Sequence, residues 1–154
     1  LKLGHDEAEM VWGNGWSATE YARHFQCLNN GVVIVTIGSD GAIAFDGDSV
    51  VSQTGYVVDV VDQVGAGDAF IAGFFGSIFR NLQVNQFFDL DPPTRNAVLQ
   101  DALMTANVCG ALTCTQRGDT EAMPSLQEVD SLRIVLGKRT RDQMKRNLVK
   151  LGLD

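Results

Sequence analysis

Near the middle of the chain runs Val61-Asp62-Gln63-Val64-Gly65-Ala66-Gly67-Asp68-Ala69-Phe70, a glycine-rich turn that leads into an apolar helical pattern. Apolar residues recur at every fourth position from Phe70 to Leu82, which predicts a buried helix over residues 69–82. Small residues where a loop enters a helix allow close backbone approach, and the free amides of the first turn point at whatever binds there. The turn therefore offers a candidate anion hole, formed by Gly65, Ala66 and Gly67.

Asp68 adds a carboxylate to this turn. It falls in the first helical turn, where the positive end of the helix dipole stabilises the ionised form. An ionised carboxylate beside an anion hole can accept a proton from a hydroxyl while that oxygen attacks a phosphoryl group held by the amides. A simpler interpretation is that Asp68 only caps its helix and that the glycines serve packing. The tetrapeptide alone leaves both interpretations open.

A second glycine-rich turn, Thr36-Ile37-Gly38-Ser39-Asp40-Gly41, ends a β-branched run over residues 32–37. The run predicts a strand buried on both faces, as in a parallel sheet. The hydroxyl and glycines of the turn suit the phosphates of a nucleotide, although a plain hairpin turn has the same composition. The turn has no Walker lysine, and Phe70 stands where a dinucleotide fingerprint needs a small residue, so a hydride-transfer enzyme is disfavoured.

The rest of the chain alternates predicted helices and strands. Capping boxes at Ser17–Glu20 and Ser125–Glu128 predict two helix starts, with helix ends at residues 29–31 and near Gly137. The remaining predicted elements are an antiparallel strand pair, residues 42–46 and 49–58, and a long helix, residues 94–115, introduced by Pro92 and Pro93. This order indicates an α/β layered fold.

Composition and charge exclude several classes of protein. The chain has 154 residues, 45% of them hydrophobic, and a formal charge of -7, as in an ordinary globular chain. Six of the 12 basic residues lie in residues 138–154, so the preceding body is strongly acidic and nucleic-acid binding is disfavoured. The longest apolar runs are too short to span a bilayer.

The cysteines and the first residues indicate the origin of the chain. Three cysteines without CxxC or Cys/His spacing fit neither a disulfide framework nor a zinc site, so we expect a reducing cytoplasm. The chain opens with Leu1-Lys2-Leu3-Gly4, without an initiator methionine. We therefore expect residue 1 to be an internal position of a longer protein.

Residues 61–70, the turn at residues 36–41 and Ala106-Asn107 in the predicted long helix together resemble the C-terminal half of a ribokinase-type (PfkB family) sugar kinase. The resemblance runs from about Leu1 to Leu136. It implies a ribokinase-like layered sheet with helices on both faces, present here as the C-terminal, nucleotide-binding portion. Residues 1–137 would form the nucleotide-binding and catalytic-base half of the kinase domain, and residues 138–154 a basic, helical tail.

The resemblance also implies an activity and its residues. The reaction would be ATP-dependent phosphoryl transfer to a hydroxyl of a sugar or keto-sugar acid, with Asp68 as general base and with ATP and Mg²⁺ as cofactors. The remaining implied roles fall on residues of the two turns and the long helix: an anion hole of Gly65, Ala66 and Gly67, nucleotide phosphate contacts from Thr36, Gly38 and Gly41, and Asn107 beside the adenine.

The choice of sugar rests on a loop. Residues 117–125 are similar to the tail loop of 2-keto-3-deoxygluconate kinases, which favours that substrate, although a surface connection explains such a loop equally well. Fructokinase and other hexose kinases stay open. The alternative to an enzyme is a non-catalytic nucleotide-binding fragment or module.

Two departures from the family pattern concern metals. The family's Asn-x-x-Glu motif helps to organise Mg²⁺ and phosphate; here Glu7 is present, but Gly4 replaces the asparagine. The resemblance further implies a monovalent cation (K⁺) site at Asp62, and this site is in doubt because Ala122 replaces its serine ligand. The remaining implied ligands of the K⁺ site are the carbonyl oxygens of Val64, Thr113, Gln116 and Gly118.

The resemblance also implies that the whole family chain is about twice as long as this one and that its first half supplies most sugar contacts. It leads us to expect a small-molecule sugar as substrate and a homo-oligomer in the full-length form. From the charge and the short apolar runs, we expect no nucleic-acid or membrane partner.

Overall fold

A four-stranded mixed sheet lies at the centre of the structure, a computed structural model that describes residues 1–80 and 82–135. Strand β2 pairs in parallel with β1, whereas β2 with β3 and β3 with β4 are antiparallel. Gly4 lies opposite Thr36, and Thr36 lies opposite Ala42. The carboxyl ends of β1 and β2 therefore meet at one edge of the sheet. The strands in spatial order are β1 (Lys2–Gly4), β2 (Val33–Thr36), β3 (Ala42–Phe45) and β4 (Val50–Gln53).

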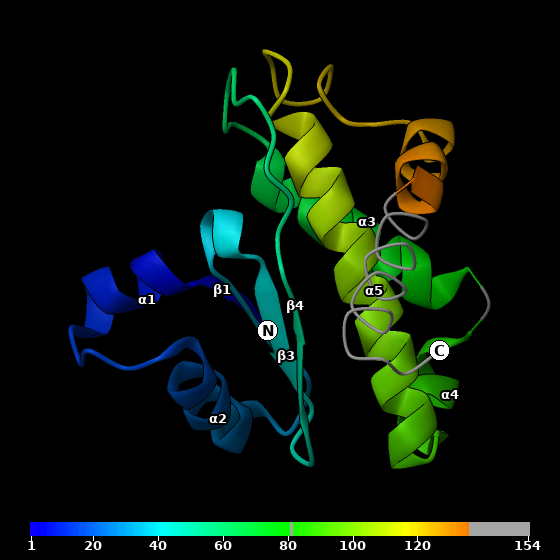
Figure 1. Cartoon of the computed structure of the whole chain (residues 1–154). Helices are drawn as coiled ribbons and strands as arrows, with labels where there is room; N and C mark the ends of the chain where they lie inside the picture. Colours follow the sequence, from blue (N-terminus) through cyan, green and yellow to red (C-terminus); the bar gives the residue numbers. More distant parts are fainter. Residues whose placement is uncertain (81, 136–154) are drawn as a thin grey trace, which may run out of the picture.

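Helices cover both faces of this sheet (Figure 1). One face carries α1 (His5–Trp12) and α2 (Ala18–Asn29), and the other carries α3 (Ala66–Phe79) and α5 (Pro92–Thr113). Successive side chains of a strand point to opposite faces. Val33 and Val35 accordingly pack in the cluster with α2, and Ile34 packs in the cluster with α3 and α5. The predicted doubly buried strand and the α/β layered fold are confirmed.

Side-chain caps fix the helix starts that the sequence predicts. The Ser17 amide donates to Glu20 Oε2 at 2.7 Å, and the Glu20 amide donates to Ser17 Oγ at 3.3 Å. Asp91 caps α5, which begins at Pro92. The Ser125–Glu128 box is also formed, and residues 126–135 are helical. The predicted end of that helix near Gly137 and the predicted tail over residues 138–154 lie outside the described residues.

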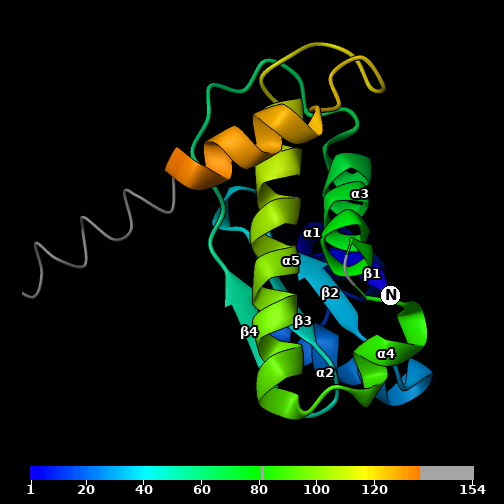
Figure 2. The ribbon, with the colours of Figure 1, turned by 90° about the vertical axis from the view of Figure 1, so that its right-hand side faces the viewer.

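Glycines let α3 and α5 lie side by side, as Figure 2 shows. A Cβ on Gly73 would lie 2.6 Å from Cys109 Sγ, so the two helices approach each other at the closest distance that glycine allows. Gly110 makes a similar approach, since its Cβ would lie 3.2 Å from the carbonyl oxygen of Ala66. The first turn of α3 is thereby held against the second half of α5.

Several elements differ from the predictions. Strand β1, helix α1 and the short helix α4 (Val84–Asp89) are present but were not predicted. Strand β4 ends at Gln53 rather than at residue 58, because its partner β3 begins only at Ala42, opposite Gln53. Helix α3 begins and ends three residues earlier than predicted, at Ala66 and Phe79. Among the described residues, no helix combines the length and hydropathy needed to cross a membrane.

Candidate nucleotide and phosphate site

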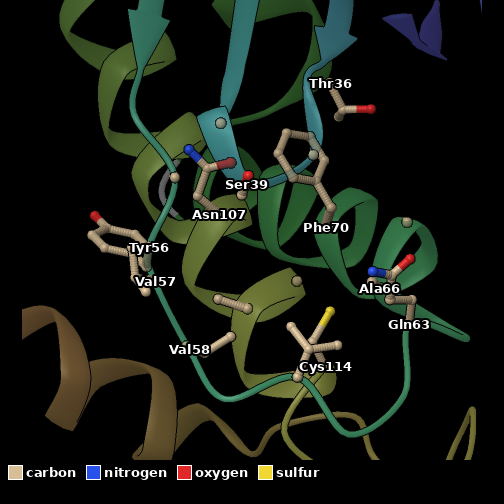
Figure 3. Close-up of a pocket in the computed structure, with 17 residues that line it drawn as sticks. Thr36, Ser39, Tyr56, Val57, Val58, Gln63, Ala66, Phe70, Asn107 and Cys114 are labelled. Atoms are coloured by element: carbon tan, nitrogen blue, oxygen red, sulfur yellow. The ribbon is translucent and has the colours of Figure 1, made fainter. Parts of the chain in front are cut away.

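A cavity of about 420 Å³ lies where the end of β2, the segment after β4, the start of α3 and the second half of α5 meet (Figure 3). It brings together predicted site residues from three separate parts of the sequence. Gly65 adjoins the cavity as the residue that precedes α3, whereas Asp68, Glu7 and Asp62 are not part of its lining. The predicted site residues in the lining are Thr36, Gly38, Gly41, Ala66, Gly67 and Asn107.

The first turn of α3 presents unpaired backbone donors. Gly65 has a φ of 78°, and a Cβ on it would lie 2.5 Å from Asp119 Oδ1, so only glycine fits there. The amide of Ala66 donates to the Gln63 carbonyl at 3.3 Å. The amides of Gly67 and Asp68 have no hydrogen-bond partner among the described residues. This is the arrangement that favours an anion.

Gly67 differs from Gly65 because the fold does not require a glycine there. Its φ is not positive, and the nearest atom to a Cβ on it would be Lys2 Nζ, at 3.2 Å. Lys2 lies on β1, and its flexible side chain could move away. The ammonium group of Lys2 thus lies beside Gly67, where its positive charge increases the attraction for an anion.

The carboxylate of Asp68 is exposed in the same helical turn. It makes no hydrogen bond or ion pair with any described residue, and no side chain caps α3. The simpler interpretation, in which Asp68 caps its helix, is therefore wrong: the N-cap residue is Gly65, and Asp68 makes no capping hydrogen bond. The carboxylate remains free to accept a proton from a hydroxyl placed beside the turn.

The glycine turn after β2 is shaped by contact with the chain's own backbone. Gly41 has a φ of 105°, and a Cβ on it would lie 2.1 Å from the carbonyl oxygen of Gln53. A Cβ on Gly55 would lie 2.2 Å from the carbonyl oxygen of Ser39. The turn and the segment after β4 are therefore pressed together, and glycine is required on both sides. Gly38, with a φ of 54°, faces open space.

The remaining wall of the cavity is largely apolar. Burial raises the pKa of the Tyr56 hydroxyl and of the Cys114 thiol, and the nearby Asp62 carboxylate raises the pKa of Cys114 further. Both groups are therefore neutral near pH 7. A slot of this kind suits a flat, uncharged ring. Its other members are Val57, Val58, Val60, Gly110 and Ala111.

The sequence is similar to those of known carbohydrate kinases. The profile of the pfkB family carbohydrate kinase matches residues 1–126. The chain belongs to this family. Probable fructokinase-4 of Arabidopsis thaliana is 30% identical over 132 residues, which is 86% of this chain and 38% of that protein. Fructokinase of Vibrio alginolyticus is 32% identical over 114 residues, or 73% of this chain and 34% of that protein.

Two solved kinase structures share the fold. Aminoimidazole riboside kinase from Salmonella enterica, complexed with aminoimidazole riboside and an ATP analog, superimposes with a TM-score of 0.68 at 29% identity. It is matched over 84% of this chain and 40% of its own length. Fructokinase from Vibrio cholerae, bound to fructose, ADP and calcium, gives a TM-score of 0.66 at 28% identity over 84% of this chain and 39% of its own. This pfkB-family chain thus spans about two fifths of those chains.

The two predicted metal residues lie at the edges of the cavity region. Glu7 follows β1, and its Oε2 accepts the Gly4 amide at 2.9 Å, so the carboxylate is held near the end of the sheet. Asp62 Oδ1 accepts the Val64 amide at 3.1 Å, and the Asp62 amide donates to the Cys114 carbonyl at 3.2 Å. Within the described ranges, no three His, Cys, Asp or Glu side chains gather in a metal-binding group. Both metal roles stay predictions.

Sequence reasoning missed Lys2 and the wall after β4. Lys2 was not predicted as a site residue because its strand, β1, has only three residues and shows no periodic pattern. Its approach to Gly67 therefore could not be predicted. The wall was assigned to a longer strand, although Gly55 in that run could have indicated a break. Gln63, which also lines the cavity, lies inside the quoted glycine-rich stretch.

Proposed function

We propose that this pfkB-family chain forms the nucleotide-binding and general-base part of an enzyme that transfers the γ-phosphoryl group of ATP to a hydroxyl of a sugar or keto-sugar acid. One observation carries the proposal. The first turn of α3 carries free amides at Gly67 and Asp68 and the unpaired Asp68 carboxylate, and the ammonium group of Lys2 lies beside Gly67. Phosphoryl transfer needs donors for the phosphoryl oxygens and an acceptor for the hydroxyl proton.

Each group has a distinct role in the reaction. The amides of Gly67 and Asp68 and the ammonium group of Lys2 hold the oxygens of the transferred phosphoryl group, on which negative charge is concentrated. The Asp68 carboxylate accepts the proton of the sugar hydroxyl as that oxygen bonds to phosphorus and the bond to ADP breaks. The apolar slot at Val58, Ala111 and Cys114 takes the base.

Two carboxylates are assigned to metals. Glu7 lies at the end of β1, where its second carboxylate oxygen can accept from water bound to Mg²⁺ on the triphosphate. The bound Mg²⁺ would neutralise charge on the phosphate oxygens. Asp62 and neighbouring carbonyl groups would hold a monovalent cation, at a site where Ala122 contributes no oxygen.

Two observations bear on the identity of the sugar, and they favour different substrates. The loop over residues 117–125 favours 2-keto-3-deoxygluconate, whereas the fructokinases among the relatives favour fructose. Both substrates present a hydroxyl to the same base. We propose that the protein in its full-length form is a homo-oligomer, as the resemblance implies.

A non-catalytic nucleotide-binding module is the second candidate. It is favoured by a cavity whose lining suits a nucleotide. Sugar-dependent release of ADP separates the two candidates. We expect release with fructose or 2-keto-3-deoxygluconate only when the sugar-binding half is also present, because an unplaced hydroxyl gains little from a base.

Calorimetric titration of ADP tests the phosphate site in the chain itself. Lys2→Met should raise the ADP dissociation constant about tenfold or more at low salt, because a charge-assisted contact to phosphate is lost. Arg80→Met is the matched control, since Arg80 lies at the opposite end of α3 and is paired with Asp130. Failure of the parent chain to bind ADP, or an equal effect of both substitutions, would contradict the proposal.

A further inference from the structure

Asn107 is distinguished from the other buried polar side chains of the described residues by where its hydrogen bonds go. Thr105 and Thr113 donate to the carbonyl oxygens of Asp101 and Cys109, four residues earlier in the same helix. Asn107, only 8% exposed, instead donates out of α5. Its Nδ2 reaches the carbonyl oxygens of Gln53 at 3.1 Å and Thr54 at 3.2 Å.

These two acceptors mark the point at which the chain leaves the sheet. Gln53 is the last residue of β4, and residues 54–60 have no regular secondary structure. The next backbone anchors along this segment are the Val61 and Asp62 amides, which both donate to the carbonyl of Cys114. The hydrogen bonds that hold the cavity wall over residues 55–60 therefore lie at its two ends, at Asn107 and at the Cys114 carbonyl just after α5, while the Tyr56 side chain packs against the cluster of Val108 and Cys109.

The same point also supports the glycine turn after β2. A Cβ on Gly41 would meet the Gln53 carbonyl oxygen at 2.1 Å and the Gly55 amide at 2.5 Å, so the turn rests directly on the segment that Asn107 holds. A shift of residues 53–55 would move both surfaces that face the cavity. One side chain of α5 thus supports both loops, together with the pairing of Ala42 with Gln53.

The amide group of Asn107 has a fixed orientation. Only an NH₂ group can donate to two carbonyl oxygens, so the nitrogen must face β4 and the oxygen must point away from it. Figure 3 shows the nitrogen turned toward the strand that leads to Tyr56, and the oxygen turned toward the side of Ser39 and Phe70. The donors of Asn107 are committed to the chain itself.

We infer that Asn107 is a positioning residue, which acts on the nucleotide by holding the cavity wall over residues 55–60 and the turn at Gly41 in the binding arrangement. This inference rests on the proposed nucleotide site and assigns to Asn107 a role through the backbone rather than through the base. A wall held in place before binding need not be ordered by the ligand, and this raises affinity for every nucleotide equally.

Asn107→Asp is the decisive variant, because it keeps the size and the outward oxygen but removes both donors. Gln100→Glu is the matched control, since Gln100 Nε2 also donates from α5 to β4, to the Ser52 carbonyl and the Gln53 side chain, but to neither of the two carbonyl oxygens that Asn107 holds. Three readouts apply to the chain: calorimetric affinity for ADP, GDP and IDP, NMR order parameters of the amides of residues 55–60 without nucleotide, and circular dichroism to verify folding. If Asn107→Asp is unfolded, Asn107→Ser takes its place, because its hydroxyl is too short to reach both carbonyls.

We expect Asn107→Asp to raise the dissociation constants of ADP, GDP and IDP by the same factor, about tenfold. The order parameters of residues 55–60 should fall from about 0.85 toward 0.6, and Gln100→Glu should change neither quantity. Base-selective weakening, or weaker binding with unchanged order parameters, would indicate direct contact with the base and overturn the inference. Unchanged order parameters overturn it even if the parent chain binds no nucleotide, whereas failure of the parent alone to bind overturns the proposed function.

Discussion

Gly67→Ala tests whether Gly67 is required for ligand binding rather than for the stability of the fold. A Cβ at this position meets only Lys2 Nζ, at 3.2 Å, and the backbone is helical, so the substitution fits the free protein. Alanine is favoured over glycine inside a helix by up to about 1 kcal/mol, which should leave the melting temperature unchanged or raise it by about 2–4 °C. The new methyl group nevertheless points at the ammonium group that is proposed to share the phosphate.

The expected loss in binding follows from the contacts at stake. Displacing phosphate from the Gly67 amide or from Lys2 removes a hydrogen bond to a charged group, worth about 1.5–3 kcal/mol. The ADP dissociation constant should therefore rise about tenfold to a hundredfold, and Gly67→Val should raise it further.

Calorimetry and thermal unfolding of the same preparations measure both quantities. Gly76→Ala is the matched control, because Gly76 lies on the same helix and a Cβ on it has no atom within 4 Å. It should gain similar stability and bind ADP like the parent. Unchanged ADP binding in folded Gly67→Ala would show that no ligand approaches this glycine and would refute the reasoning.

Two further predictions concern stability. Gly41→Ala should destabilise the chain by about 3 kcal/mol, lowering the melting temperature by about 10 °C, because its Cβ would lie 2.1 Å from the Gln53 carbonyl oxygen at a φ of 105°; a melting temperature within 2 °C of the parent would contradict this. Burial of Asp46 tends to raise its pKa, but amide hydrogen bonds from Ser49 and Asp48 and the Arg95 guanidinium at 2.6 Å outweigh burial and lower it. Because the folded-state pKa is lowered, the stabilisation is present above the unfolded value near 3.9 and is lost as the pH falls through the folded value. Asp46→Asn should therefore cost about 3 kcal/mol at pH 7 and progressively less below about pH 4 in urea unfolding, and a difference that does not change with pH would count against this account.

The elements that the sequence predicted well carry their own local signals. The Ser17–Glu20 box sets the start of α2, the β-branched run sets β2, and the apolar spacing from Phe70 sets α3. Each of these signals acts within a few residues, so no tertiary contact was needed to interpret it. The meeting of the two glycine turns with Asn107 followed from the family resemblance, because nothing in the local pattern joins residues so far apart.

The elements that escaped prediction depend on distant partners. Strand β1 exists because Lys2–Gly4 pairs with β2, more than 30 residues away. Helix α1 begins at a glycine N-cap without a side-chain cap, so only Glu7, which reaches back to the Gly4 amide, signals its start. Strand β4 stops at Gln53 because its partner, β3, begins at Ala42, directly after the turn at Gly41.

The site shows the same division. Asp68 and the anion hole were predicted from one local turn, and the family resemblance added the nucleotide residues. Lys2 beside Gly67 and the attachment of Asn107 to Gln53 arise only when β1 and β4 take their places in the sheet. Contacts of this kind leave no trace in periodicity or spacing.

The central claim is that Asp68 accepts the proton of the attacking hydroxyl. Its most direct test is sugar-dependent ADP formation by the full-length protein that carries this chain, with Asp68 and with Asp68→Asn. Asparagine keeps the size of the side chain but cannot take a proton, so kcat should fall about a hundredfold to ten-thousandfold while ADP affinity changes little. A kcat within a few-fold of the parent, at equal folding and ADP affinity, would remove Asp68 from the mechanism.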